Sequence, residues 1–297
     1  MKYPKNFGID IKVKRPTDYV IGASGLSEEI INSSGDWTKY LPVKEYQKFS
    51  WGDSMQCVTM SALNCLEILH KFKYKKELNW SDRFTAKMSN TTHKGNWLTT
   101  VGDSIRHDGL ILEEDYTNEA NSWNDYYKEI LQESKDKGIS FLQNYKINYE
   151  WIVPTDADGL EHALKIAPIQ VVVHAWENSV NGIYKKTSLP LNHAVTLINS
   201  VHGEYRDVFD HYDSTTKRLS WDYIIQHGFK YSITKNKMEF IKEKNKSAVY
   251  LVKGKEIIPI NDGLDFLNLQ LDWSEVITVD NLDGYTIVDK KLYTFIR

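Results

Sequence analysis

The sequence contains only two cysteines, Cys57 and Cys65, among its 297 residues. They lie eight positions apart in a stretch of helical periodicity. A helix rises about 1.5 Å per residue, so the two thiols lie too far apart to form a disulfide. We therefore expect a fold that does not depend on disulfides or on an oxidising compartment, and we expect Cys65 to be a core residue.

No segment of the sequence has the apolar length of a membrane span, and residues 1–6 are not followed by the apolar core of a signal peptide. The net charge of -3 does not favour binding to nucleic acid or to an anionic membrane. Zinc-ligand spacings, phosphate-binding glycine loops and internal repeats are also absent from the sequence. We therefore expect no metal, cofactor, nucleic-acid or membrane partner. The lysine- and asparagine-rich composition favours a cytoplasmic or virion-associated protein of microbial or viral origin.

The residues that are present are typical of a globular enzyme. The hydrophobic fraction is 41% and the charged fraction 26%, which are ordinary values for a soluble protein. A chain of 297 residues can bury a large core, either in one domain of two halves or in one domain with a small appendage.

The most informative stretch is residues 52–67, with the sequence GDSMQCVTMSALNCLE. Asp53 and Ser54 are good helix N-caps. After them, apolar residues recur at spacings of three and four, which predicts a helix with one buried face: Val58, Ala62, Cys65, Leu66 and Leu69. Cys57 then falls in the first turn, where free amides and the helix dipole favour an anion. We therefore predict a thiol with a lowered pKa, which becomes a nucleophile when a base stands beside it.

Two motifs carry a resemblance to the papain-like cysteine peptidases. Residues 57–67 resemble the helix of that family's nucleophile, and residues 36–47, which contain Asp-Trp and Pro-Val-Lys, resemble the approach to it. Residues 192–195, Asn-His-Ala-Val, open an apolar strand and resemble the strand of the family's catalytic histidine. The resemblance covers about residues 36–215 and implies Cys57 as nucleophile and His193, 136 positions later, as its base.

The resemblance also implies a glutamine that holds the oxyanion. Gln47 is the candidate, since a side-chain amide can donate to a carbonyl oxygen at the nucleophile. It lies ten positions before Cys57, where the family has six, which implies an insertion of about four residues near 49–52. Gln56 is the alternative donor.

The third catalytic residue is an asparagine in the family, and it orients the histidine. Asp210 aligns with it, and Asp213 is the alternative. A carboxylate accepts an imidazole N–H as well as an amide oxygen does. Residues 93–116 resemble one wall of the family's substrate cleft, which implies that Gly95 and Asn96 offer backbone hydrogen bonds to an extended peptide.

We predict an α+β, papain-like fold with a cleft between a helical half, about residues 50–138, and a β-rich half, about 139–235. Residues 34–235 then form the peptidase domain. An N-terminal lead at 1–33 comes before it, and a small β-rich extension at 236–297, which could dock a protein partner, follows it. The lead is shorter than the family's inhibitory propeptides, so we predict no zymogen of the usual kind.

Local patterns predict individual elements. They favour one helix over 122–137 ended by Gly138, a helix over 156–165, and strands at 168–175, 192–198 and 206–214. Residues 220–231 are expected to form a helix or an aromatic surface segment, and 235–246 a linker. Short strands are predicted at 248–252, 257–260, 276–279, 285–288 and 292–296.

The predicted function is a cysteine endopeptidase that acts on peptide or protein substrates through a Cys57–His193 pair. Two alternatives remain open. One is a thiol amidase acting on a non-protein or cell-wall amide, with the same catalytic residues. The other is a catalytically inactive relative used for binding or structure, which the departures from the family pattern favour: Val58 in place of a tryptophan, the displaced Gln47, the aspartate at 210 and the lack of disulfides.

Overall fold

The computed structural model describes residues 6–11, 29–152, 157–177, 179–236, 239–253, 255–260 and 276–288. The helices are η1 (Thr38–Tyr40, a 3-10 turn), α1 (Cys57–Tyr74), α2 (Asp82–Met88), α3 (Leu98–Asp108), α4 (Trp123–Tyr126), α5 (Gln132–Asn144) and α6 (Ala157–Leu164). None of the helices in these ranges is both long enough and apolar enough to cross a bilayer.

The strands before residue 237 form a hairpin and one large sheet. The hairpin is β1 (Lys48–Phe49) with β2 (Gly52–Asp53). The large sheet has eight strands in the order β3-β10-β4-β7-β8-β9-β6-β5. Their bounds are β3 (Tyr145–Ile152), β4 (Ile169–Val173), β5 (Ser179–Val180), β6 (Ile183–Tyr184), β7 (His193–Val201), β8 (Tyr205–Asp210), β9 (Thr215–Ser220) and β10 (His227–Lys235).

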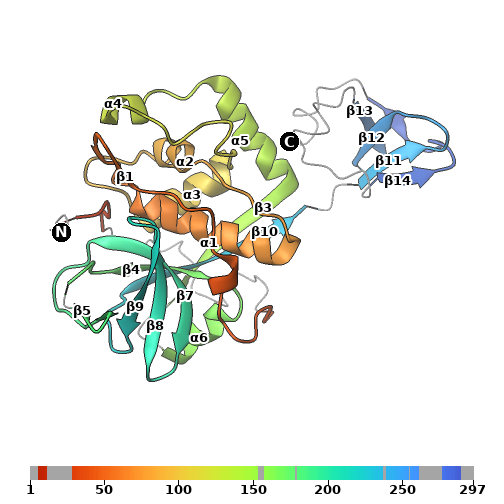
Figure 1. Ribbon diagram of the computed structural model, residues 1–297. Helices are drawn as coiled ribbons and strands as arrows, with labels where there is room; N and C mark the ends of the chain where they lie inside the picture. The colour runs from red at the N-terminus through yellow and green to blue at the C-terminus, as the bar shows by residue number, and fades with distance from the viewer. Residues whose placement is uncertain are drawn as a thin grey trace.

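Helix α1 lies at the centre of the molecule. Figure 1 shows it between helices α2–α5 on one side and strands β4–β9 on the other. It packs against α2 and α3 and also against β4, β7 and β10, which is why its residues from Cys57 to His70 are all buried. The amphipathic helix that the sequence predicts is therefore a helix buried on nearly all sides over its first four turns.

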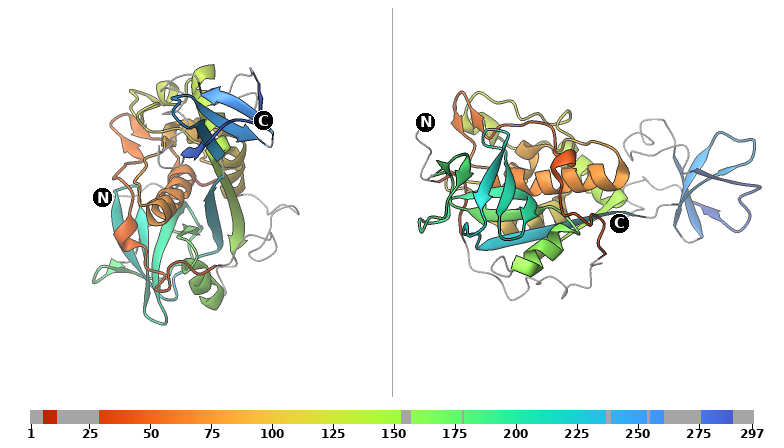
Figure 2. Two further views of the ribbon diagram at one scale, coloured as in Figure 1. Left: turned by 90° about the vertical axis from the view of Figure 1, so that its right-hand side faces the viewer. Right: turned by 60° about the horizontal axis from the view of Figure 1, so that its bottom comes forward.

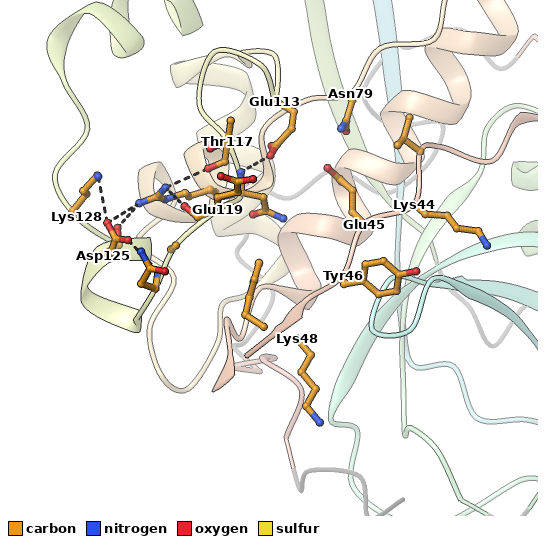
Figure 3. Close-up of a pocket in the computed structure, with 16 residues that line it drawn as sticks. Lys44, Glu45, Tyr46, Lys48, Asn79, Glu113, Thr117, Glu119, Asp125 and Lys128 are labelled. Carbon is orange, nitrogen blue, oxygen red and sulfur yellow. Dashed lines mark hydrogen bonds and ion pairs between the residues drawn. The ribbon is translucent and has the colours of Figure 1, made fainter. Parts of the chain in front are cut away.

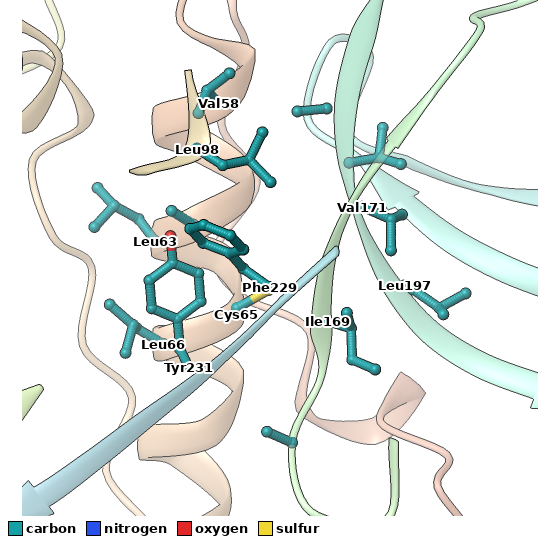
Figure 4. Packing of buried hydrophobic residues seen from close by; sticks show 14 of the residues in the cluster. Val58, Leu63, Cys65, Leu66, Leu98, Ile169, Val171, Leu197, Phe229 and Tyr231 are labelled. Atoms are coloured by element: carbon teal, nitrogen blue, oxygen red, sulfur yellow. The ribbon is translucent and has the colours of Figure 1, made fainter. Parts of the chain in front are cut away.

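The core joins the two halves through α1. Figure 4 shows Val58, Leu63, Cys65 and Leu66 of this helix facing apolar side chains of α3 and the sheet: Leu98, Ile169, Val171, Leu197, Phe229 and Tyr231. Both cysteines are free, as the sequence predicts, and both are buried, which the sequence predicts only for Cys65. The thiol of Cys65 lies 4.0 Å from the Thr196 hydroxyl, inside this core.

The region 122–144 differs from its prediction. Ser122 does cap a helix, α4, but that helix ends at Tyr126, and a second helix, α5, runs through Gly138. Gly138 is needed for close packing, because a Cβ there would lie 2.4 Å from the Asp108 carbonyl oxygen and 3.0 Å from the Phe84 ring. The sequence pattern predicts a helix end at Gly138, but this glycine instead allows a close contact between helices, which no local pattern reports.

The start of α1 also differs from its prediction. The helix begins at Cys57, and the residue before it, Gln56, makes no side-chain cap. The Asp53 carboxylate instead accepts hydrogen bonds from the Met55 amide and from Gln47. The expected insertion near 49–52 is the β1–β2 hairpin, which pairs Lys48 with Asp53 and Phe49 with Gly52.

Two predictions for residues 220–246 are wrong. Residues 227–235 form β10, a buried strand between β3 and β4, and neither a helix nor a surface segment. The expected linker contains the strand β11 (Glu239–Glu243), because its apolar residues Phe240 and Ile241 are buried. The lysines around Phe240 and Ile241 hide the apolar pattern that would have indicated this strand.

The strands after residue 238 form a second sheet with its own core. Its order is β14-β11-β12-β13-β15, with β12 (Val249–Lys253), β13 (Glu256–Ile260), β14 (Val276–Val279) and β15 (Thr286–Ile287). Its apolar cluster is separate from the main core and consists of Phe240, Val249, Leu251 and Ile258. Figure 2 shows it beside the body of the molecule in the right-hand view. The strand predicted at 292–296 lies outside the described residues.

Candidate active site

Tertiary packing places Cys57 against the start of the strand that begins with His193. Cys57 is the first residue of α1 and His193 is the first residue of β7, and these two elements pack on each other. The Cys57 thiol accepts a hydrogen bond from the backbone N–H of Ala194, the residue directly after His193. The two predicted catalytic residues thus lie at the start of a helix and at the start of the strand that packs on it.

The His193 ring is oriented by Asp210, at the end of β8. Its Nε2 lies 2.8 Å from Asp210 Oδ1. The Trp176 indole donates a hydrogen bond of 2.6 Å to Oδ2 of the same carboxylate, and Lys217 Nζ lies 3.4 Å from it. Because Nε2 is engaged, the nitrogen that can exchange a proton with Cys57 is Nδ1, which has no hydrogen-bond partner among the described residues.

The charge of Asp210 is stabilised by these neighbours. Burial disfavours the ionised form, but the charge and hydrogen bond of His193, with smaller contributions from His211 and Lys217, lower the pKa of Asp210 well below its usual range. Asp213, the alternative third residue, binds Lys217 and the Thr215 hydroxyl instead. Its side chain is 41% exposed, so among the two aspartates it is Asp210 that contacts His193.

Of the two candidate glutamines, Gln47 binds Phe7, whose ring lies against the His193 ring. Its Nε2 donates hydrogen bonds to the Phe7 carbonyl oxygen at 2.6 Å and to Asp53 Oδ1 at 2.7 Å. The Gln56 side chain faces the helical half, where its Oε1 accepts a hydrogen bond of 2.6 Å from the Tyr126 hydroxyl. The extra residues near 49–52 form the β1–β2 hairpin, so Gln47 keeps its contact with Phe7 despite its larger distance from Cys57 in sequence.

An N-terminal segment, residues 6–11, lies over these groups. Phe7 is fully buried, with its ring 4.6 Å from the His193 ring and 4.8 Å from the Tyr212 ring. The Phe7 amide donates to the Asn192 carbonyl at 2.8 Å. With this segment in place, Cys57, His193 and Asp210 have no exposed surface.

The same segment pairs with the predicted peptide-binding wall. The Asn96 amide donates to the Gly8 carbonyl at 2.9 Å, and the Asp10 amide donates to the Asn96 carbonyl at 2.7 Å. These two bonds form a parallel bridge between Ile9 and Asn96. Asn96 thus pairs with a segment of the chain itself, whereas the backbone of Gly95 bonds to Thr92 and not to that segment.

The thiol environment differs from the prediction of a lowered pKa. Burial raises the pKa of Cys57 well above its usual range, and the charges of Asp53 and Asp210 act in the same direction. Hydrogen bonds from the Ala194 and Val58 amides oppose the rise without cancelling it. A helix N-terminus favours a thiolate only where water or a cation also reaches the sulfur, and the segment at 6–11 covers it.

Several residues of the site have no signal in the local sequence. Trp176 and Lys217 contact Asp210 from the loop after β4 and from β9. His211 is buried beside His193, and burial together with the positive charge of His193 lowers its pKa to about 3. Lys217 lies on β9, next to β8, whereas Trp176 and His211 lie in the loops after β4 and β8, so no strand pattern could have indicated their role.

Two groups of residues in the described part of the chain could hold a metal ion. His193, Asp210 and His211 offer ligand atoms within 4.8 Å of one another, as do Asp158, Glu161 and His202. In the first group the His193 Nε2 is already used by Asp210. The second group is partly exposed, and nothing in the structure points to a ligand there.

A separate pocket of about 1010 Å³ lies on the helical half, and the catalytic residues are not among those that line it. Figure 3 shows Glu45, Asn79 and Glu113 at one end and Asp125 and Lys128 at the other. Behind the acidic end lie the buried carboxyls of Glu67 and Asp82. Burial raises the pKa of every acid in this cluster: Glu45, Glu67, Asp82 and Glu113. Repulsion from neighbouring carboxylates adds to the rise for Glu67, Asp82 and Glu113, whereas hydrogen bonds with Asp82 and Asn79 oppose it at Glu45.

This acidic cluster predicts a stability that falls with rising pH. Burial, with the charge of Glu45, raises the pKa of Glu113 to about 8 from 4.5. Between these values the folded chain binds a proton that the unfolded chain has released, so the stability is full below 4.5 and is lost as pH rises towards 8. This loss should appear as a decline in Tm as the pH rises towards 8. We expect the decline to be smaller by roughly 2–4 °C in the Glu113→Gln variant, as measured by thermal unfolding. The exposed neighbour Glu114→Gln is the control, and an equal decline in both variants would contradict the prediction.

Comparisons with known proteins support the architecture. No family model matches the chain, and no curated protein sequence matches it. Among solved structures, the clostridial cysteine protease Cwp84 after propeptide cleavage has a TM-score of 0.54 at 12% identity, over 71% of this chain and 61% of that one. The cysteine protease and lectin-like domains of Cwp84, a surface layer associated protein of Clostridium difficile, have a TM-score of 0.53 at 13% identity, over 72% and 55%.

A third similar structure is the digestive procathepsin L 3 of the Tenebrio molitor larval midgut, with a TM-score of 0.49 at 15% identity, over 77% of this chain and 76% of that one. The chain spans less than two thirds of both Cwp84 structures. At such identities the likeness establishes the fold. The chain has the papain-like cysteine peptidase fold, as its sequence predicts, and the fold is of the α+β class.

Proposed function

We propose that this chain, with its papain-like fold, is a cysteine endopeptidase that hydrolyses peptide bonds through Cys57 and His193. The observation that carries the proposal is the placement of Cys57 at the start of α1 beside a histidine whose Nε2 is held by a buried carboxylate at 2.8 Å. This arrangement supplies a nucleophile, a base and an orienting group, which is what acyl transfer through a thiol requires.

The proposed reaction begins with transfer of the Cys57 proton to Nδ1 of His193. The thiolate sulfur then attacks the carbonyl carbon, and the electron pair of the C=O bond moves to the oxygen. The backbone N–H of Cys57 and Nε2 of Gln47 hold this oxyanion. His193 gives its proton to the leaving amine, which departs and leaves a thioester. Water, deprotonated by His193, hydrolyses the thioester and restores the thiol.

The neighbours of His193 support this role. Asp210 fixes the ring so that Nδ1 faces the reaction and stabilises the imidazolium that forms. Trp176 and Lys217 both contact Oδ2 of that carboxylate, which leaves Oδ1 to hold His193. No step of the reaction uses a metal or a cofactor.

Turnover requires a second state of the N-terminal segment. A substrate carbonyl must occupy the place now taken by the Phe7 carbonyl at Gln47, so residues 6–11 must leave first. The segment therefore acts as an inhibitor in the state described. The prediction of no inhibitory lead rests on length alone, and the position of Phe7 over His193 argues against it.

The function is tested by peptide cleavage. A chain with Phe7→Ala, which weakens the hold of the segment, is incubated with a mixed peptide library, and new N-termini are identified by mass spectrometry. We expect the Phe7→Ala chain to cleave peptides, and we expect the cleavage rate to fall by at least about a thousandfold when Cys57→Ala is added. Ammonia release from simple amides without peptide cleavage would favour the thiol amidase. A folded chain that does neither would favour the inactive, binding role.

A further inference from the structure

Gly8 passes between two walls that are made of main chain. Its φ is +110°, and a Cβ at this position would lie 2.2 Å from the Met55 carbonyl oxygen and 2.4 Å from its carbon. On the other side lies Gly95, with a φ of +91°, where a Cβ would lie 1.8 Å from the Gly8 carbonyl oxygen. Three backbones therefore meet at this point with no room for a side chain between them.

The two walls are held in place by their own hydrogen bonds. The Met55 amide donates to Asp53 Oδ1 at 2.7 Å, and Met55 itself has a φ of 58°. The Gly95 amide donates to the Thr92 carbonyl at 2.7 Å, and the Thr92 amide donates back to Gly95 at 3.2 Å. Since the atoms that a Cβ would meet belong to main chain, a change of side-chain rotamer cannot widen this gap.

The gap lies next to the proposed reaction centre. The peptide bond between Phe7 and Gly8 has its carbonyl oxygen 2.6 Å from Nε2 of Gln47, the proposed oxyanion donor. Gly8 is the neighbour of that carbonyl along the chain. A substrate that presents its scissile carbonyl at the same place must continue through the same gap, whichever way its chain runs.

We propose that the cleft selects glycine: its substrates are peptides with a glycine directly next to the bond that Cys57 attacks. This rests on the proposed function and deepens it by naming a substrate class. The Met55 carbonyl and Gly95 bound a narrow gap, here called the gate, that admits main chain but no side chain. The N-terminal segment fits the cleft because Gly8 lies in this gate. Residues with a Cβ are excluded there by direct overlap with main-chain atoms.

The first test uses the full chain and needs no catalysis. Gly8→Ala places a Cβ in the gate, so the segment can no longer stay seated and Cys57 becomes accessible. We expect iodoacetamide to alkylate Cys57 at least about tenfold faster than in the wild type. Gly203→Ala is the matched control, because Gly203 also has a positive φ, +75°, but nothing lies within 4 Å of its Cβ position.

A second variant guards against misfolding. Gly95→Ala narrows the gate from the opposite wall and is expected to expose Cys57 in the same way, while thermal unfolding shows whether each variant is folded. If a folded Gly8→Ala or Gly95→Ala chain shows the same slow alkylation of Cys57 as the Gly203→Ala control, the proposal that the gate admits only glycine is wrong.

The second test reads substrate choice. The Gly8→Ala chain is incubated with a peptide library, and glycine is expected to be enriched at least about tenfold on one side of the cleaved bonds. Cleavage with no enrichment of glycine would overturn the gate and leave the proposed peptidase standing. Exposure of Cys57 without any cleavage would instead count against the peptidase, while the alkylation result would still support the narrow gate.

Discussion

In a chain with Phe7→Ala, Cys57 is expected to react with iodoacetamide about 100-fold faster than in the wild type. The Phe7 ring is fully buried between His193 and Tyr212. Truncating such a ring to a methyl group costs about 3–5 kcal/mol in a core, and each 1.4 kcal/mol is a factor of about ten in the opening equilibrium. Because Cys57 has no exposed surface, alkylation must follow opening of the segment.

The control for this prediction is Phe72→Ala. Phe72 packs on Trp37 and Tyr40 at the far end of α1 and does not touch the N-terminal segment. The Phe72→Ala substitution also removes a phenylalanine ring and lowers the global stability. It should nevertheless leave the alkylation rate of Cys57 close to that of the wild type under native conditions. If Phe7→Ala is folded and reacts no faster than Phe72→Ala, the segment does not guard the thiol.

The second large effect concerns His193. In the Phe7→Ala background, His193→Ala is expected to lower the rate of labelling by an epoxysuccinyl reagent by about 100- to 1000-fold at neutral pH. Even in the open state, a thiol with an ordinary pKa of about 8.5 is mostly protonated at neutral pH, so the sulfur depends on a neighbouring base to become a thiolate. Removing the ring removes the base that accepts the proton and the cation that stabilises the product.

Another buried histidine serves as the control. His174 follows β4 and is 8% exposed, and its Nδ1 lies 2.6 Å from the Pro190 carbonyl. His174→Ala removes a ring of the same kind with no contact to Asp210, and labelling should change only a few-fold. Peptide mass spectrometry identifies the labelled cysteine. Fast labelling of Cys57 that survives His193→Ala would show that the thiol is not activated by this histidine.

The proposed catalytic pair, Cys57 and His193, illustrates how much of the candidate site the sequence predicts. The residues after Cys57 and after His193 indicate a helix and a buried strand, and both elements are present, although the helix begins only at Cys57 and lacks the predicted cap at Asp53 or Ser54. Residue type then limits the chemistry, since a thiol and an imidazole form a nucleophile and a base. The order of the two motifs along the chain indicated the fold that solved structures now establish.

The choices between alternatives needed the tertiary structure. Gln47 and Gln56 are the same residue type in the same stretch, but the β1–β2 hairpin places the first near Phe7, whereas the second binds Tyr126. Asp210 and Asp213 differ by three positions, and only the end of β8 places the first on His193. In each case the deciding contact joins residues that lie 17 to 70 positions apart, beyond the reach of a local pattern.

The sequence by itself determined the types of element, the absence of disulfides and the chemical groups available for catalysis, because these follow from residue type and from neighbours a few positions away. Tertiary structure decided that residues 6–11 cover the site, that burial raises rather than lowers the pKa of Cys57, and that Gly8 and Gly138 serve close contacts. Each of these depends on what packs against a residue from elsewhere in the chain. Burial and contact are properties of the folded core, and local patterns carry no information about them.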